Sequence, residues 1–185
     1  MRVPIREEHE YPFWLRPFFA SQRRHYGKPL TSGQVWARVP RLFAAIALLY
    51  GALDRKRSPV APVLRSLIMV RVSQINWCEF CVDLNGATLA KRAGSFEKVE
   101  ALEGWRDSPL FDARERAVLD YAEAVTYSDR QVSEEMMIEL RRYFDDDGIV
   151  ELTGLIAFQN LSSKFNAALD IPAQGFCKLP TRPKA

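Results

Sequence analysis

Residues 64–94 form the stretch LRSLIMVRVSQINWCEFCVDLNGATLAKRAG, and this stretch decides the fold. Its first half has the periodicity of an apolar helix, expected over 60–75, which Asn76 and Trp77 then break. A second helix is expected from 78 or 79 to 92, with Gly94 as a left-handed C-terminal cap. The pair Cys78 and Cys81 therefore lies in the first turn of a core helix.

The same periodicity continues on both sides of this stretch, and no turn signal between β-branched runs indicates a strand pair. Helix starts are indicated by Ser95, by Ser133 and by Asp112 with Glu115, which together form a capping box. Further helices are expected over 40–54, 95–102, 112–127, 133–144 and 149–169. The sequence thus predicts an all-α protein.

The chain divides into three parts without a linker long enough to separate two domains. Residues 1–40, which are rich in prolines and aromatics, are expected to wrap a helical domain at 41–172, and 173–185 form a tail. The helix at 149–169 is apolar around most of its circumference, which favours burial inside the bundle or against another subunit. Its polar stripe, Gln159, Ser163 and Asn166, either bonds to neighbouring groups or forms a substrate-facing wall.

The composition is that of an ordinary globular chain. Hydrophobic residues make up 48% and charged residues 26% of 185, which excludes a disordered or collagen-like protein. The net charge of +3 is small and the basic runs at 23–25 and 55–57 are short, so no nucleic-acid partner is expected. An odd number of cysteines favours a reducing compartment, and the polar N-terminus does not resemble a signal for export. The longest apolar run, 42–53, is too short to span a bilayer. We therefore expect a cytoplasmic protein without a membrane partner.

The cysteine pair carries the clearest chemical signal. At a helix start the two sulfurs lie within disulfide reach and face unpaired backbone N–H groups, which favours a thiolate. A thiolate attacks a peroxide oxygen or a disulfide sulfur, and the second cysteine resolves the product. The sequence predicts two-electron redox chemistry, and local physics alone does not choose the attacking cysteine.

Other interpretations of the cysteines are weaker. Zinc needs four ligands, and only Cys177, His9 and His25 remain, so neither a metal nor a cofactor is expected. Two inert buried cysteines are an alternative. The thioredoxin fold needs a strand before the motif, where a helix is expected here. Cys177 is either a structural cysteine or a third redox partner brought by the tail.

Around this motif the sequence resembles the carboxymuconolactone decarboxylase family, and specifically its alkylhydroperoxidase D-like (AhpD-like) branch. The likeness rests on residues 64–94, on AVLDYAEAVT at 117–126 and on LIAFQNLSSKFNAALDIP at 155–172. It implies an AhpD-like helical bundle in which the cysteine pair opens a core helix, assembled into trimers or hexamers. It also implies that Cys81 attacks and Cys78 resolves.

The chain departs from that branch at two positions. Studied members carry a relay glutamate and histidine where this sequence has Ser66 and Asn85. Neither side chain titrates near neutral pH, so neither relays protons, and both are expected to act as hydrogen-bond positioners. Other candidates for the relay have structural alternatives: Glu79 and Asp83 as capping or solvated carboxylates, His25 as a surface histidine, and Tyr121 and Tyr127 as core or interface residues.

Three hypotheses follow. The first is a thiol-dependent oxidoreductase of peroxiredoxin type, in which Cys81 reduces a hydroperoxide or disulfide, Cys78 closes the disulfide and an external thiol or dithiol restores both. The second is a decarboxylase acting on a muconolactone-type acid, which the absence of histidine near the motif disfavours. The third is an oligomeric binding or redox-sensing protein that is oxidised without turning over.

Overall fold

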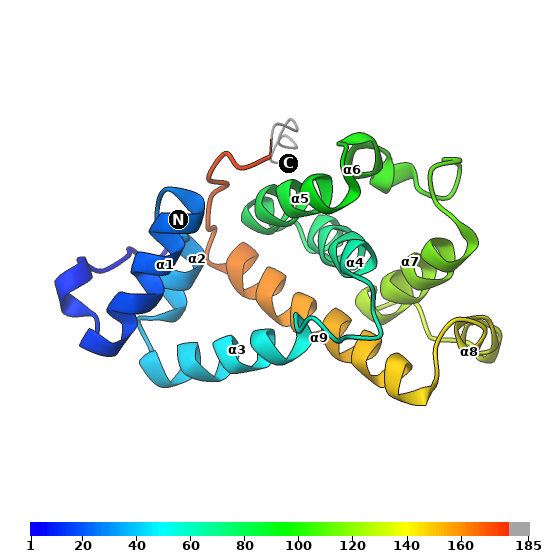
Figure 1. The fold of residues 1–185 in the computed structure, drawn as a ribbon, viewed down its shortest axis with the longest axis horizontal. Helices are drawn as coiled ribbons and strands as arrows, with labels where there is room; N and C mark the ends of the chain where they lie inside the picture. The colour runs from blue at the N-terminus through cyan, green and yellow to red at the C-terminus, as the bar shows by residue number, and fades with distance from the viewer. Residues whose placement is uncertain (178–185) are drawn as a thin grey trace.

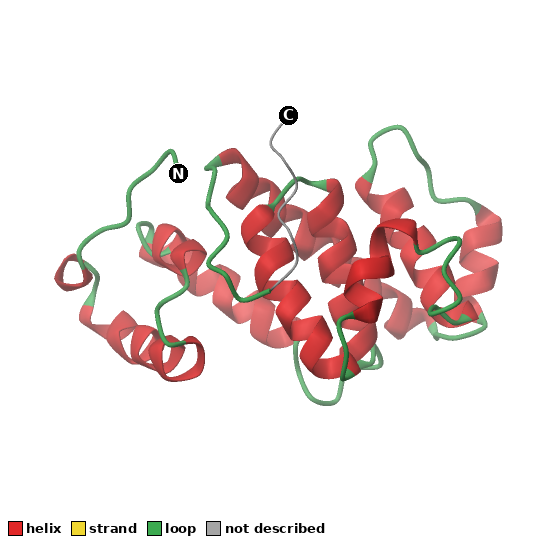
Figure 2. Cartoon of the chain, turned by 90° about the horizontal axis from the view of Figure 1, so that it is seen from above, coloured by secondary structure: helices red, strands yellow, loops and turns green. Residues whose placement is uncertain are grey.

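The computed structural model describes residues 1–177, and over this range the chain consists of helices and loops without a strand (Figure 1, Figure 2). The predicted all-α class is therefore confirmed. Three short 3-10 helices lie at Glu8–Glu10, Phe13–Leu15 and Leu102–Gly104. The α-helices of the described range are α1 Arg16–Tyr26, α2 Thr31–Trp36, α3 Pro40–Leu53, α4 Pro62–Ile75, α5 Glu79–Ala93, α6 Glu97–Ala101, α7 Ala113–Thr126, α8 Glu134–Arg141 and α9 Asp146–Ala168.

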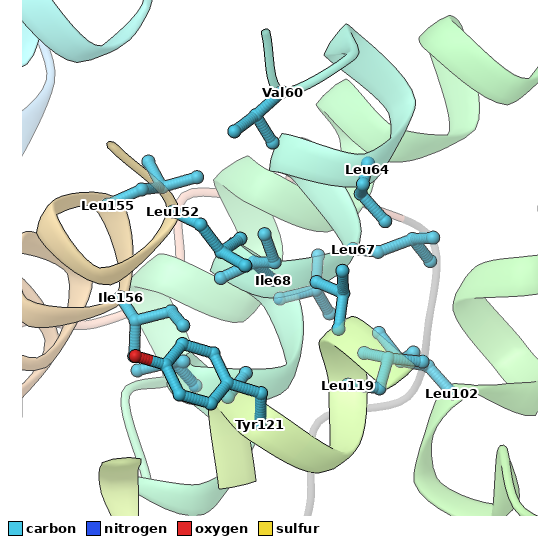
Figure 3. Packing of buried hydrophobic residues seen from close by; sticks show 14 of the residues in the cluster. Val60, Leu64, Leu67, Ile68, Leu102, Leu119, Tyr121, Leu152, Leu155 and Ile156 are labelled. Atoms are coloured by element: carbon cyan, nitrogen blue, oxygen red, sulfur yellow. The ribbon is translucent and has the colours of Figure 1, made fainter. Parts of the chain in front are cut away.

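Helix α4 forms the centre of the bundle and packs against α5, α7 and α9 (Figure 1). Leu67 and Ile68 of α4 are fully buried, and Figure 3 shows them among side chains from α7 and α9, including Leu119 and Leu152. Burial of each such side chain stabilises the fold by about 1.5–3 kcal/mol. This core holds the start of α5 in place, because α5 packs on α4 along its length.

Local capping signals explain several helix boundaries. Asp112 and Glu115 make both bonds of the predicted capping box, and Ser133 accepts a hydrogen bond from the Met136 N–H. The predicted cap at Ser95 is wrong, because α6 begins after Phe96, which makes no side-chain cap bond. The helix expected over 133–144 ends earlier, at Arg141.

The junction between α4 and α5 presents the cysteine pair. Trp77 has a φ of 55°, a left-handed conformation that is uncommon for a bulky side chain and lets α5 start in a new direction. Cys78 is the N-cap of α5, as the sequence predicts to within one residue, and Gly94 ends the helix with a φ of 80°. Both caps confirm the expected boundaries of this helix.

The N-terminal segment has a small core of its own, at the opposite end of the molecule from α7 and α8 (Figure 1). Tyr11, Leu15 and Phe19 are nearly completely buried within it. The Trp36 ring stacks on the Phe165 ring of α9, with centroids 3.5 Å apart. This stack joins the N-terminal segment to the last helix of the bundle.

Helix α3 is apolar along its length but buries few of its side chains. Only Phe43 and Leu53 are buried, and Leu48 is 78% exposed. It contacts α2 and α9, and its outer side faces solvent in the single chain. The sequence alone suggests a buried helix at this position, so its outer face is an unusual surface feature.

A buried carboxylate on α7 stabilises the bundle through ion pairs. Glu123 of α7 is 3% exposed and pairs with Arg71, Arg106 and Arg130, and it also accepts a hydrogen bond from the Trp105 indole. Burial raises the pKa of Glu123, but the hydrogen bonds from Arg106, Trp105 and Arg71 outweigh burial and hold the pKa below its usual value.

Candidate functional site

The two cysteines of the motif lie at the N-terminus of α5, where they form a disulfide with a Cα–Cα distance of 5.2 Å. The Cys78 sulfur accepts a hydrogen bond from the Cys81 backbone N–H at 3.1 Å, which makes it the side-chain cap of the helix. Both side chains are almost completely buried, at 1% and 3% exposure. Access to the sulfurs therefore depends on an internal space.

Such a space lies beside Cys81. A cavity of about 330 Å³ is lined by Cys81, whereas Cys78 is absent from its wall. The two cysteines thus differ in their access to the cavity, a difference that the local sequence does not predict. The aromatic residues of the wall are Phe18, Tyr26, Trp36, Phe43, Tyr50, Phe80 and Phe158.

Asn166 contacts the Cys81 sulfur directly. Its side-chain Nδ2 donates a hydrogen bond to the sulfur at 3.2 Å, and its Oδ1 accepts one from the Ser32 hydroxyl at 2.7 Å. Asn166 is 1% exposed, so both bonds are shielded from water. A donor in this position stabilises a thiolate at Cys81 without exchanging a proton with it.

Two further amides reach the cavity near Ser73. The Gln159 Nε2 donates to the Ser73 hydroxyl at 2.8 Å, and the Asn85 Nδ2 approaches the same oxygen at 3.5 Å. Asn85 and Gln159 both line the cavity wall. The structure thus places Asn85 in the same cavity as Cys81, as a neutral polar group.

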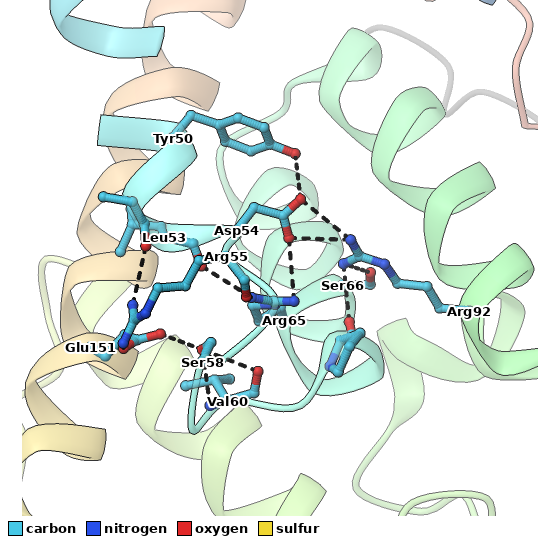
Figure 4. Close-up of polar contacts among 12 residues, drawn as sticks. Tyr50, Leu53, Asp54, Arg55, Ser58, Val60, Arg65, Ser66, Arg92 and Glu151 are labelled. Atoms are coloured by element: carbon cyan, nitrogen blue, oxygen red, sulfur yellow. Dashed lines mark hydrogen bonds and ion pairs between the residues drawn. The ribbon is translucent and has the colours of Figure 1, made fainter. Parts of the chain in front are cut away.

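The structure places Ser66 elsewhere. Its hydroxyl accepts a hydrogen bond from Arg92 at 3.0 Å, and it does not line the cavity (Figure 4). Arg92 also bonds to Asp54, which in turn accepts a hydrogen bond from the Tyr50 hydroxyl at 3.4 Å. Burial and the negative charge of Asp54 raise the pKa of Tyr50 to about 12. Ser66 is thus linked to Tyr50 of the cavity wall through Arg92 and Asp54.

The carboxylate of Asp83 is a structural anchor. It is buried, and its two oxygens accept hydrogen bonds from the backbone N–H groups of Gln174, Gly175 and Cys177 at 2.6–2.8 Å. The Gln174 side chain in turn accepts from the Thr31 N–H at 2.8 Å. Residues 171–177 thereby form a strap that ties the α1–α2 loop to α5. Of the tail expected at 173–185, residues 173–177 lie in this strap, and 178–185 lie outside the described residues.

The remaining candidates do not meet the cavity. His25 is exposed and contacts the Tyr26 ring edge-on, and Glu79 lies in the first turn of α5. The Tyr121 hydroxyl bonds to Thr153 in the core. Cys177 packs over Gly86 of α5, where an added Cβ would lie 3.1 Å from its sulfur.

Sequence reasoning missed the part of the wall that precedes residue 40. Gln22, Leu30, Ser32 and Trp36 line the cavity together with Phe18 and Tyr26. No local signal marks them, because they meet the cysteines only through the fold. Of the polar stripe on α9, Gln159 and Asn166 face the cavity, while Ser163 donates to the Gln159 carbonyl. Among residues 1–177, no cluster of three potential metal ligands occurs.

An all-helical bundle whose core helix opens on a buried cysteine pair, beside an internal cavity, defines an AhpD-like fold. Over 99% of this chain and 97% of the other, it superposes on the alkylhydroperoxidase AhpD core, an uncharacterized peroxidase-related protein from Ralstonia eutropha JMP134, with a TM-score of 0.87 and 24% identity. The debrominase Bmp8, as a Cys-to-Ala variant in complex with 2,3,4-tribromopyrrole, gives a TM-score of 0.82 at 22% identity, covering 95% of this chain and 93% of that chain.

Sequence comparison identifies the family. The carboxymuconolactone decarboxylase family matches residues 40–124. The uncharacterized protein YnjA of Escherichia coli strain K12 is 45% identical over 171 residues, which are 92% of this chain and 94% of that protein. The chain belongs to the carboxymuconolactone decarboxylase family. In the described part of the chain, no helix is both long and apolar enough to span a membrane.

Proposed function

We propose that this protein is a thiol-dependent oxidoreductase that reduces an organic hydroperoxide with the Cys78–Cys81 pair. The observation that supports this most is the asymmetry of the pair: Cys81 is part of the cavity wall and Cys78 is not. A substrate in the cavity meets Cys81 first. Cys78 lies within disulfide distance behind it, where a resolving thiol belongs.

The reaction takes place in three balanced steps. The Cys81 thiolate attacks one oxygen of the hydroperoxide, the O–O bond breaks, and the alkoxide leaves and takes up a proton as an alcohol. The Cys78 thiol then displaces water from the Cys81 sulfenic acid and forms the disulfide. An external dithiol, or two thiols, reduces the disulfide and restores both cysteines.

Neutral amides take the place of a titrating relay in this proposal. Asn166 holds the Cys81 thiolate, and Asn85, one turn further along α5, positions a peroxide oxygen in the same cavity. Ser66 acts at one remove, because it holds Arg92, which fixes Asp54 beside Tyr50. The proton for the leaving alkoxide comes from water.

The test follows the loss of thiols when reduced protein meets one equivalent of cumene hydroperoxide. We expect fast loss of two thiols, with a Cys78–Cys81 linkage found by peptide mapping. Cys81→Ser abolishes the reaction, Cys78→Ser leaves a sulfenic acid, and the control Cys177→Ser reacts like the wild type. Thiols that remain reduced refute the proposal. Oxidation that is fast but does not cycle with dithiothreitol supports a redox sensor instead.

A second candidate is thiol-dependent dehalogenation of a halogenated aromatic compound. The aromatic wall beside Cys81 favours it, as does the likeness to a debrominase. In this reaction the Cys81 thiolate accepts the halogen, the aromatic carbon takes up a proton, and Cys78 displaces halide to form the disulfide. Bromide release from a bromopyrrole by reduced protein, lost in Cys81→Ser, tests it.

A further inference from the structure

We infer that the cavity beside Cys81 binds an uncharged aromatic molecule, and that the wall built by residues 18–50 decides which one. This inference deepens the proposed function and rests on it for the role of Cys81. Three observations support it: the cavity wall is uncharged, its size and aromatic lining fit one ring, and part of it comes from the N-terminal segment.

The cavity wall carries no ionised side chain among the described residues. Its polar members are hydroxyl and amide groups: Gln22, Tyr26, Ser32, Tyr50, Asn85, Gln159, Ser162 and Asn166. Asp54, the carboxylate next to the wall at Tyr50, is paired with Arg65 and Arg92. A carboxylate substrate would lose its hydration here without gaining a cation, and desolvation of an unpaired charge is strongly unfavourable.

The size and chemistry of the wall fit one ring with a small polar substituent. The volume of about 330 Å³ accommodates about ten water-sized groups at roughly 30 Å³ each. The seven aromatic rings of the wall offer edge-to-face contacts, and the amides near Cys81 offer hydrogen bonds to one polar group. A neutral ring whose polar substituent points to Cys81 satisfies both ends.

Part of the cavity wall comes from the N-terminal segment. Phe18, Tyr26 and Trp36 stand on α1 and α2, before residue 40, where the match to the family begins. The Leu30 N–H donates to the Gln22 side chain at 3.0 Å, which shapes the α1–α2 loop at the cavity. The reactive pair thus lies within the residues matched by the family, whereas part of the cavity wall comes from the N-terminal segment that precedes them.

The uncharged wall disfavours, in this cavity, the reaction after which the family is named. A muconolactone-type acid carries a carboxylate, and the cavity wall has no cation to receive it. The same argument applies to other anionic substrates of similar size. Specificity in this pocket therefore depends on charge first and on shape second.

The experiment measures binding without turnover, using calorimetry on the reduced protein. The probe is 2-phenylpropan-2-ol, the alcohol formed from cumene hydroperoxide, and benzoate is the anion of matched size. We expect the alcohol to bind and to protect Cys81 from iodoacetamide, with benzoate roughly tenfold weaker or worse. Equal binding of both, or no binding of either, overturns the inference.

Two wall variants locate the specificity. Ile46→Arg places a cation in the cavity wall and is expected to make benzoate the better ligand, whereas Ala44→Arg, exposed on the same helix, changes nothing. Leu30→Ala weakens alcohol binding, and Phe13→Ala, exposed and outside the cavity, does not. Unchanged ligand preference in Ile46→Arg refutes the assignment of the wall.

The two proposals fail independently. If the alcohol binds but hydroperoxides do not oxidise the thiols, the proposed peroxidase function is wrong and the ligand class stands. If hydrogen peroxide oxidises the pair while the alcohol does not bind, the ligand class is wrong and thiol chemistry stands.

Discussion

Replacing Asn166 by alanine removes the hydrogen bond that reaches the Cys81 sulfur. In the structure, the Asn166 Nδ2 lies 3.2 Å from that sulfur, and the amide is 1% exposed. Its other end is held by the Ser32 hydroxyl. No charged group lines the cavity among the described residues, and this amide is a side-chain donor that reaches the Cys81 sulfur. We therefore expect Asn166→Ala to slow reactions of Cys81 in the reduced protein.

The size of the effect follows from two opposing contributions. A hydrogen bond to a charged group contributes about 1.5–3 kcal/mol, so its loss lowers the thiolate population by roughly 10- to 100-fold at a pH where the thiol dominates. The remaining thiolate is more basic and hence more nucleophilic, with a Brønsted coefficient of about 0.4–0.5. The net expectation is alkylation about 3- to 15-fold slower than in the parent protein.

The assay measures iodoacetamide modification of Cys81 by peptide mass, in a Cys78→Ser background that keeps the helix cap. Asn160→Ala is the matched control, since Asn160 lies on the same helix and bonds to Thr126 and Asn76 rather than to sulfur. Asn166→Asp, which places a like charge beside the thiolate, is expected to be slower than Asn166→Ala. If Asn166→Ala reacts at the parent rate, or Asn160→Ala slows equally, the assignment of Asn166 is refuted.

Three further predictions concern stability and assembly. Asp83→Asn replaces one accepting oxygen by an NH2 group that faces the N–H groups of the strap, so hydrogen bonds are lost. We expect the free energy of unfolding to fall by about 2 kcal/mol and the Tm by roughly 4–8 °C in a thermal melt. Asp107→Asn, at an exposed position, is the control. Because the folded-state pKa of Glu123 is lowered, the stability it contributes is present above its ordinary pKa of 4.5 and is lost as the pH falls through the folded value. Glu123→Gln is therefore expected to lower stability at pH 7 and to flatten the acid limb in urea titrations from pH 7 to 3. We also propose that copies of the chain associate through the outer face of α3, so that Leu48→Glu reduces the mass in light scattering while Ile138→Glu, exposed on α8, does not.

Much of the helical pattern could be predicted because its signals are local. Capping at Asp112 and Ser133, and the glycine at 94, depend on side chains within a few residues of each helix end. The predicted cap at Ser95 was wrong because a serine can cap a helix but need not do so. Phe96 occupies the N-cap position without a side-chain bond, and packing holds α6 instead. The cysteine pair and its place at the start of α5 are likewise local features of the sequence.

The cavity could not be predicted, because its parts come from distant segments of the chain. Trp36 and Asn166 lie far apart in sequence and come together only when α2 packs on the end of α9. Helical periodicity shows which face of each helix is apolar, but it does not show which faces meet. The sequence alone therefore allowed two interpretations of the polar stripe on α9: bonding to neighbouring groups or a substrate-facing wall. The contact between Asn166 and the Cys81 sulfur becomes visible only in the structure.

The departure from the relay residues of the AhpD-like branch also involves a contact between distant segments. Ser66 and Asn85 occupy those positions in the sequence, yet the amide that reaches the Cys81 sulfur comes from Asn166, on a different helix. A neutral donor stabilises a thiolate over a wide pH range but cannot supply a proton. In a site built this way a leaving alkoxide takes its proton from water, whereas protonation of a carbanion after decarboxylation needs an acid held at that carbon. The uncharged cavity and the missing relay thus both favour thiol chemistry over decarboxylation.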